Sequence, residues 1–223
     1  IFNDVAFESN FYNLGFIDSW TMAFGFGLQI YFDFSAYSHM AIGISNIVGL
    51  PIKENFIFPY SSKSVSEFWK RWHISLSLWV SDYLYKFLNS KITKYFLGML
   101  PLLITWTIMG IWHGASLRFA FWGLLNGFFI VIHRIYKVNK FNFLKKIETK
   151  FLSNFLTLFS IMSSWLFFRS NSWEQSNYLF KTLFKVKKID LAFSENYYLI
   201  VFIFTVMNLL LGFLWTSKFF KKF

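Results

Sequence analysis

The sequence predicts an all-α polytopic membrane protein, with about five to six transmembrane helices and one amphipathic segment that is re-entrant or interfacial. Its 223 residues are 56% hydrophobic and 24% aromatic, and only 15% of them are charged. A soluble domain has about 25% charged residues and cannot hide this much apolar surface. Long stretches without Asp, Glu, Lys or Arg are the second observation, because about 20 apolar residues of helix cross a bilayer.

Charge-free windows mark the helices that we expect to span the membrane. The four windows lie between Lys94 and Arg118, Arg118 and Arg134, Lys150 and Arg169, and Glu195 and Lys218. Upstream, the apolar stretches 18–33 and 33–53 are interrupted by acidic residues and glycines. We therefore expect one or two further helices there, with breaks.

The segment 53–94 is too charged to span the membrane and too aromatic for a solvated loop. Ser64 and Glu67 have the spacing of a capping box at the start of a helix. Large apolar residues then recur every three or four positions, at Trp69, Trp72, Leu76, Trp79 and Tyr83. This spacing predicts one face of an amphipathic helix. We expect the segment to be part of a single membrane-embedded domain over 1–223.

The basic residues favour a membrane over nucleic acid as the partner of this chain. The net charge is +11, and only four of the 22 basic residues are Arg. Lysines concentrate in 137–150 and in the tail, which places both in the cytoplasm and His113 toward the other side. The chain starts at Ile1 without a signal-peptide pattern, so we expect a C-terminal piece whose N-terminal helices are missing.

Histidine is the side chain best suited to proton transfer near neutral pH. His113 lies between Gly110 and Gly114 in an otherwise charge-free window, where an ionisable residue is costly. The glycines remove side-chain bulk, so a substrate can approach closely, and aromatic neighbours would keep the ring neutral. The alternative is a structural histidine that is hydrogen-bonded to a neighbouring helix.

His73 is the second candidate. It follows Lys70 and Arg71, whose positive charges lower a histidine pKa and favour a neutral ring. Interfacial anchoring is the alternative, because Trp, Lys and Arg are common at headgroup depth. His133 is expected at the interface, and His39 is too far along a helix from Asp33 to face it.

Several chemistries lack the residues that they need. There is no cysteine, which excludes disulfides, thiol catalysis and thiolate metal sites. No pair of histidines has metal-ligand spacing, so we expect no metal site. Neither a nucleophile elbow nor a glycine-rich phosphate loop is present.

Three blocks combine these histidines with aromatic and acidic neighbours. They are Tyr31-Phe32-Asp33-Phe34-Ser35 within 31–43, Glu67-Phe68-Trp69-Lys70-Arg71-Trp72-His73 within 54–85, and Gly110-Ile111-Trp112-His113-Gly114 within 110–124. Together they resemble the membrane-bound O-acyltransferase family, and within it the alginate O-acetyltransferase branch. The resemblance extends over residues 20–130. It implies a polytopic enzyme that moves an acyl group onto a hydroxyl.

The resemblance also implies roles for particular residues. The family's invariant histidine matches His113, and its second signature polar residue matches His73. Candidate substrate-binding residues lie in the same blocks: Asp33, Trp69, Arg71, Trp72, Asp82 and Trp112. There are departures, since His39 stands where the first block usually ends in Asp, and Val80-Ser81 precede Asp82 where an Arg is usual. Alginate itself is therefore not taken as the acceptor.

We expect O-acetyl transfer from a cytoplasmic acyl thioester, such as acetyl-CoA, toward an extracytoplasmic cell-envelope polysaccharide. No cofactor is bound; the location is a bacterial cytoplasmic membrane, and a separate extracytoplasmic acetyltransferase is the expected partner. His113 acts as general base, and His73 binds the donor or stabilises the oxyanion. One alternative is a D-alanyl transferase for teichoic acid. Others are a structural subunit, or a transporter with broken helices near Asp18 and Asp33.

Overall fold

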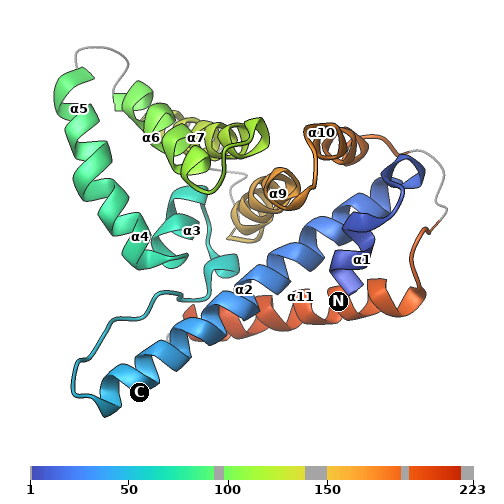
Figure 1. The fold of residues 1–223 in the computed structure, drawn as a ribbon, viewed down its shortest axis with the longest axis horizontal. Helices are drawn as coiled ribbons and strands as arrows, with labels where there is room; N and C mark the ends of the chain where they lie inside the picture. Colours follow the sequence, from blue (N-terminus) through green and yellow to red (C-terminus); the bar gives the residue numbers. More distant parts are fainter. Residues whose placement is uncertain (1, 93–97, 139–149, 187–190, 217–223) are drawn as a thin grey trace.

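The computed structural model describes residues 2–92, 98–138, 150–186 and 191–216, and these residues form helices without a strand (Figure 1). In chain order the elements are α1 (Phe2–Glu8), η1 (Phe11–Asn13), α2 (Phe16–Ile47), η2 (Pro59–Ser61), α3 (Val65–Arg71), α4 (Ile74–Trp79), η3 (Val80–Tyr85), α5 (Lys86–Ile92), α6 (Met99–Trp112), α7 (Leu117–Val138), α9 (Lys150–Arg169), α10 (Trp173–Thr182) and α11 (Glu195–Thr216). The predicted all-α fold class is confirmed.

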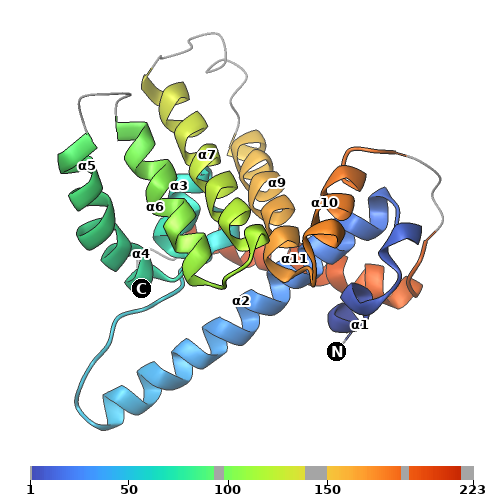
Figure 2. The same ribbon diagram turned by 45° about the horizontal axis from the view of Figure 1, so that its top comes forward.

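Three of these helices are long and apolar enough to cross a membrane. They are α7, α9 and α11, over residues 117–137, 150–169 and 195–215. Helix α6 is apolar but shorter, and α2 is longer but carries Asp18 and Asp33. Figure 2 shows α6, α7 and α9 side by side, with α2 running diagonally past one end of them.

Helix α2 differs from the expected broken helices, because it continues for 32 residues without interruption. Gly27 illustrates why its glycines do not break it. A Cβ at Gly27 would lie 2.6 Å from the sulfur of Met162, and the Gly27 carbonyl accepts a hydrogen bond from Tyr60. Gly27 therefore allows α9 and η2 to pack closely against α2, and the prediction of a break is wrong.

Helices α6 and α7 form a tightly packed hairpin. A Cβ at Gly110 would lie 2.1 Å from the carbonyl oxygen of Phe119, and one at Gly123 would lie 2.1 Å from that of Trp106. Small residues that let two backbones approach are typical of helix pairs in membranes. Gly110 thus serves helix packing, and the prediction that it makes room for a substrate is wrong.

The segment 53–94 is helical but does not present one continuous face. Ser64 caps α3 as predicted, accepting from the Glu67 amide, whereas the Glu67 carboxylate accepts from the Lys63 amide. The chain breaks after α3, because Trp72 is extended and His73 has a left-handed φ of 44°. As a result Trp72 is 4% exposed, while Tyr83 is 68% exposed. The prediction of a single helical face is therefore wrong.

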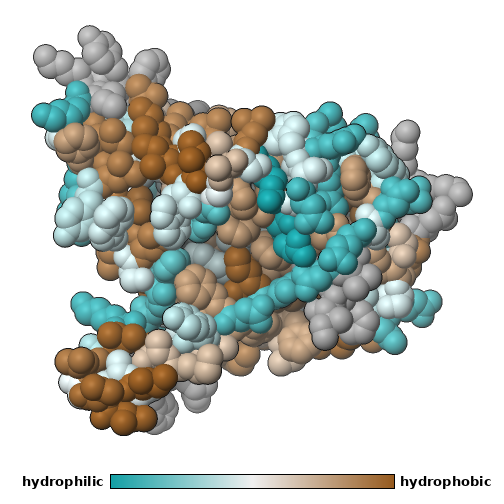
Figure 3. All heavy atoms as spheres, in the orientation of Figure 1, coloured by the Kyte–Doolittle hydropathy of each residue, from teal (hydrophilic) through white to brown (hydrophobic). Residues whose placement is uncertain are grey.

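Apolar side chains cover much of the outside of the molecule. Helix α11 is largely exposed, and Figure 3 shows a hydrophobic patch at the far end of α2. This patch includes Ile44, Ile47, Val48 and Leu50, each more than 60% exposed. Surfaces of this kind are stable in lipid and unfavourable in water.

Candidate active site

His73 and His113 line one small cavity, although 40 residues separate them in the sequence. The cavity has a volume of about 50 Å³. Its wall comes from α2, α3, α4 and the connection between them, the end of α6, α7 and α9. It includes four tryptophans: Trp69, Trp72, Trp122 and Trp165. The fold thus brings together the two histidines that the sequence singled out.

His113 caps the C-terminal end of α6 and does not lie inside a longer helix as expected. Its backbone amide donates to the Gly110 carbonyl, and the chain then turns toward α7. Its ring meets Trp122 and Phe168 edge-on, at centroid distances of 5.3 and 5.1 Å. Among the described residues the His113 imidazole makes ring contacts and no hydrogen bond, so no helix in this part of the chain holds it as a hydrogen-bonded structural histidine.

His73 sits at the break between α3 and α4, in a backbone conformation that costs about 1–3 kcal/mol for a residue other than glycine. Its ring packs edge-on against Phe34, with centroids 4.7 Å apart. Burial lowers the pKa of His73 below its ordinary value. The pKa of His73 is thus lowered by burial and not by the neighbouring cations. The consequence, a neutral ring, is the one that the sequence suggested.

Indole groups supply unused hydrogen-bond donors around the cavity. Trp69 and Trp122 are buried, and within the described part of the chain neither indole N–H has a hydrogen-bond partner. A buried donor without a partner is costly, and a catalytic role is one of the explanations for such a group in a native protein. Trp122 stands in the third sequence block but was not predicted as a site residue, and the sequence carried no signal for Trp165.

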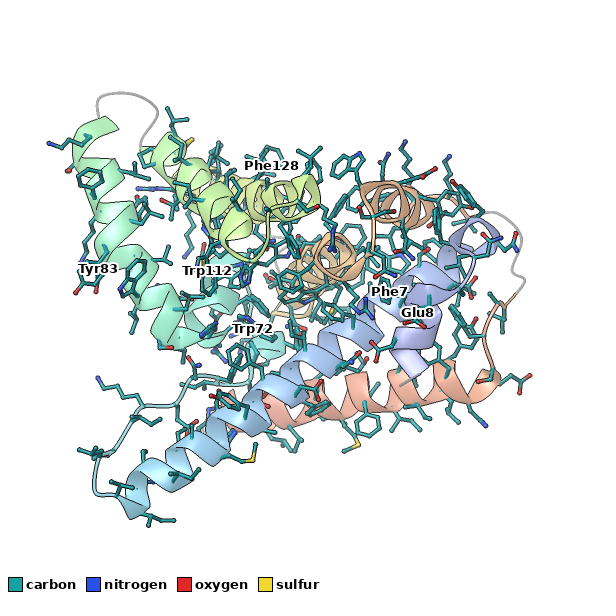
Figure 4. The ribbon with its side chains drawn as sticks, viewed as in Figure 1. Phe7, Glu8, Trp72, Tyr83, Trp112 and Phe128 are labelled. Carbon is teal, nitrogen blue, oxygen red and sulfur yellow. The ribbon has the colours of Figure 1, made fainter. Side chains whose placement is uncertain are left out.

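The six candidate substrate-binding residues separate into three groups. Trp69 and Trp72 line the histidine cavity, and Figure 4 shows Trp72 between α4 and α2. Asp33 is exposed on α2 and lines an adjoining pocket. The other three lie outside the lining of these cavities: Arg71, which pairs with Glu67; Asp82, which pairs with Lys86; and Trp112, which is 64% exposed beside His113.

Two larger pockets adjoin the histidine cavity. One, of about 640 Å³, shares Ile30, Phe34 and Phe168 with it and reaches Asp33 and Arg118. The other, of about 670 Å³, shares Trp69, Ser77 and Met109 with it and reaches Arg134.

The two pockets lie toward opposite ends of α7. Arg118 and Arg134 are separated by 16 residues of that helix, or about 24 Å at 1.5 Å per residue. This distance approaches the thickness of the hydrocarbon core, about 30 Å. The histidine cavity therefore has a pocket on each side of it along the direction in which α7 runs.

A protein-family model described as the membrane-bound O-acyltransferase family matches residues 8–173. A peptidoglycan O-acetyltransferase of Helicobacter pylori is 35% identical over 81% of this chain and 34% of its own length. A protein of Pseudomonas aeruginosa named "Probable alginate O-acetylase AlgI" is 36% identical over 75% of this chain and 31% of its own length. A teichoic acid D-alanyltransferase of Bacillus subtilis is 30% identical over 51% of this chain and 31% of its own length. The chain thus spans about a third of the length of these relatives.

Proposed function

Because the chain belongs to the membrane-bound O-acyltransferase family, we propose that it carries the transfer site of an O-acetyltransferase acting on a cell-envelope polysaccharide. The single observation that carries this proposal is the cavity shared by His73 and His113. Relatives named for O-acetylation of peptidoglycan and alginate support the reaction class and the acceptor class.

In the proposed reaction the neutral imidazole of His113 takes the proton of a sugar hydroxyl. The hydroxyl oxygen attacks the thioester carbonyl carbon, so a C–O bond forms and the C–S bond breaks. The thiolate then takes the proton from the imidazolium. General base catalysis of this kind contributes about 10²–10⁴-fold. His73 holds the donor or donates to the oxyanion, and the unpaired indole N–H groups of Trp69 and Trp122 are further donors of the kind that an oxyanion needs.

The lining of the cavity favours acetyl over D-alanyl as the transferred group. A D-alanyl ester carries an ammonium group, and burying an unpaired charge costs several kcal/mol. No Asp or Glu is among the described residues that line the cavity. A volume of about 50 Å³ also suits a small acyl group. D-alanyl transfer remains the second candidate because teichoic acid D-alanyltransferases are among the relatives.

We place the protein in the bacterial cytoplasmic membrane, with the Lys-rich end of α7 in the cytoplasm. The three apolar helices support a membrane location, and the positive-inside rule supports the orientation. The donor then enters at the end of α7 that carries Arg134, and the acetyl group leaves toward the end of α7 that carries Arg118. In a second version of the proposal, a hydroxyl of a separate extracytoplasmic acetyltransferase takes the place of the sugar hydroxyl at His113, and that partner then transfers the acetyl group to the polysaccharide.

Mild base treatment of envelope fractions tests the reaction class. Cells with and without the full-length protein are compared for ester-linked acetate and ester-linked D-alanine in each glycan fraction. The proposal expects acetate to depend on the protein and D-alanine not to. Dependence of D-alanine alone would select the second candidate, and dependence of neither would contradict acyl transfer to envelope glycans.

A further inference from the structure

Three apolar side chains separate the histidine cavity from the pocket that reaches Asp33 and Arg118, which we call the outer pocket. They are Ile30, Phe34 and Phe168, and each of them lines both spaces. Most of the remaining lining residues of the outer pocket carry polar or charged groups: Gln29, Asp33, Arg118, Arg169 and Asn171. A polar space of about 640 Å³ is large enough for many water molecules. The partition between the two spaces therefore decides whether this water reaches the histidines.

Phe168 is the member of this partition that contacts His113. Its ring meets those of His113 and Trp122 edge-on, each at a centroid distance of 5.1 Å. Phe168 lies in the last turn of α9, where the backbone carbonyls have no partner within the helix. The position of its ring therefore depends on the groups that hold this end of α9.

Arg118, in the first turn of α7, holds this end of α9. Its Nη1 donates to the Phe168 carbonyl at 3.1 Å and also to the Ser170 carbonyl. Its guanidinium lies 4.5 Å from the centroid of the Phe119 ring, and that ring in turn meets Phe168 edge-on at 5.3 Å. A positive charge at the C-terminal end of a helix is also favoured by the helix dipole. Arg118 thus fixes both the backbone of Phe168 and one neighbour of its ring.

Water that reached His113 would compete with the acceptor hydroxyl. In that reaction the water oxygen attacks the thioester carbonyl carbon, its proton passes to the imidazole of His113, a C–O bond forms and the C–S bond breaks. The thiolate then takes the proton from the imidazolium, and the products are free acetic acid and the thiol. Exclusion of water from an active site prevents this kind of loss.

We infer that Arg118 is a positioning residue, which keeps Phe168 closed over His113 until an acceptor occupies the outer pocket. An acceptor brings binding contacts that can displace the ring, whereas water brings too few. Arg118 and Phe168 together thereby favour transfer over hydrolysis. This inference rests on the proposed function, because only an acyl donor bound at His113 can be lost to water.

Hydrolysis of acetyl-CoA without an acceptor tests the inference on the full-length protein in nanodiscs. Released acetate is measured for the wild type, Arg118→Gln, Phe168→Ala and Asp4→Asn. Asp4→Asn is the matched control, because it frees Arg169, the neighbour of Phe168, from its ion pair with α1 and leaves the bonds of Arg118 in place. We expect Arg118→Gln to raise hydrolysis about tenfold, since hydrogen bonds from a charged group contribute at least this factor.

Phe168→Ala should raise hydrolysis as much as Arg118→Gln, because it removes the ring and leaves the arginine in place. Asp4→Asn should stay near the wild-type rate. A variant that fails to fold would lose hydrolysis, so misfolding cannot imitate the expected gain. The inference is overturned if Arg118→Gln and Phe168→Ala both hydrolyse acetyl-CoA at the wild-type rate, or if Asp4→Asn raises hydrolysis equally.

Backbone hydrogen exchange over 166–171, measured on the same samples, separates this inference from the proposed function. The Ser170 amide, which donates to the Leu166 carbonyl, reports on this end of α9 without any acyl chemistry. We expect faster exchange in Arg118→Gln, and unchanged exchange would overturn the inference. Faster exchange with no hydrolysis in any sample would remove the proposed function and leave the anchoring of Phe168 by Arg118 in place.

Discussion

His73 and His113 owe their positions to two local backbone features. His113 follows the last turn of α6, where the chain must reverse into α7, and His73 occupies the left-handed residue between α3 and α4. A strained residue persists only where its surroundings hold it, and such residues cluster at functional sites. The resemblance identified both histidines from sequence. Their meeting in one cavity depends on long-range packing, and no local pattern encodes it.

The left-handed backbone of His73 gives a prediction that separates strain from chemistry. His73→Gly and His73→Ala both remove the imidazole, but only glycine adopts this φ without strain. We expect His73→Gly to be more stable than His73→Ala by about 1 kcal/mol, and both to lose acetyl transfer. Thermal unfolding in matched detergent measures the first difference and ester-linked acetate the second. An alanine variant as stable as the glycine variant would show that the strain is absent.

Among the elements, the segment between α2 and α6 shows best where sequence patterns stop being informative. The capping residue Ser64 fixed the start of α3, since its hydrogen bond is local. The aromatic spacing from Trp69 to Tyr83 stays regular across the break between α3 and α4, so it does not predict this break. Trp72 follows the last residue of α3 and packs against Phe56, which precedes η2, and against Trp165 of α9, and neither contact is visible in the local sequence.

Contact between α6 and α7 gives a prediction about packing. In Gly110→Ala the new methyl group would meet the Phe119 carbonyl, a backbone atom that cannot move away easily. We expect a loss of stability of about 1–3 kcal/mol, together with reduced transfer, because His113 follows three residues later. Gly43→Ala is the matched control. Its Cβ would meet nothing within 4 Å, so a gain of about 0.5–1 kcal/mol is expected. Equal effects of the two substitutions on melting temperature would contradict this packing role.

For the molecule as a whole, composition and charge-free windows were sufficient to predict helices in a membrane. The windows lie close to the bounds of α7, α9 and α11. The length of an apolar stretch that crosses a membrane is set by the thickness of the bilayer and little by neighbouring helices. They did not predict α10, whose amphipathic sequence is too polar to form a window. They also did not predict the two pockets on either side of the histidine cavity, which arise only when α2, α3, α6, α7 and α9 pack together.

The opposite ends of α7 give a prediction of topology. The chain has no cysteine, so single cysteines introduced into an otherwise cysteine-free full-length protein can be labelled without interference from it. In intact cells we expect an impermeant maleimide to label Leu117→Cys, which lies at the exposed start of α7. Lys137→Cys should react only after the membrane is permeabilised. Labelling of Lys137→Cys in intact cells would reverse the orientation.

The most direct measurement of the central claim compares histidines inside and outside the cavity. Full-length wild type, His113→Ala and His39→Ala are brought to equal membrane abundance, and ester-linked acetate is measured in each envelope glycan fraction. His39 is exposed on α2 and lies outside the cavity, so its replacement should leave acetate near the wild-type amount. His113→Ala should reduce acetate by about 10²-fold or more. Wild-type acetate in His113→Ala would contradict the claim that this cavity is the site of acyl transfer.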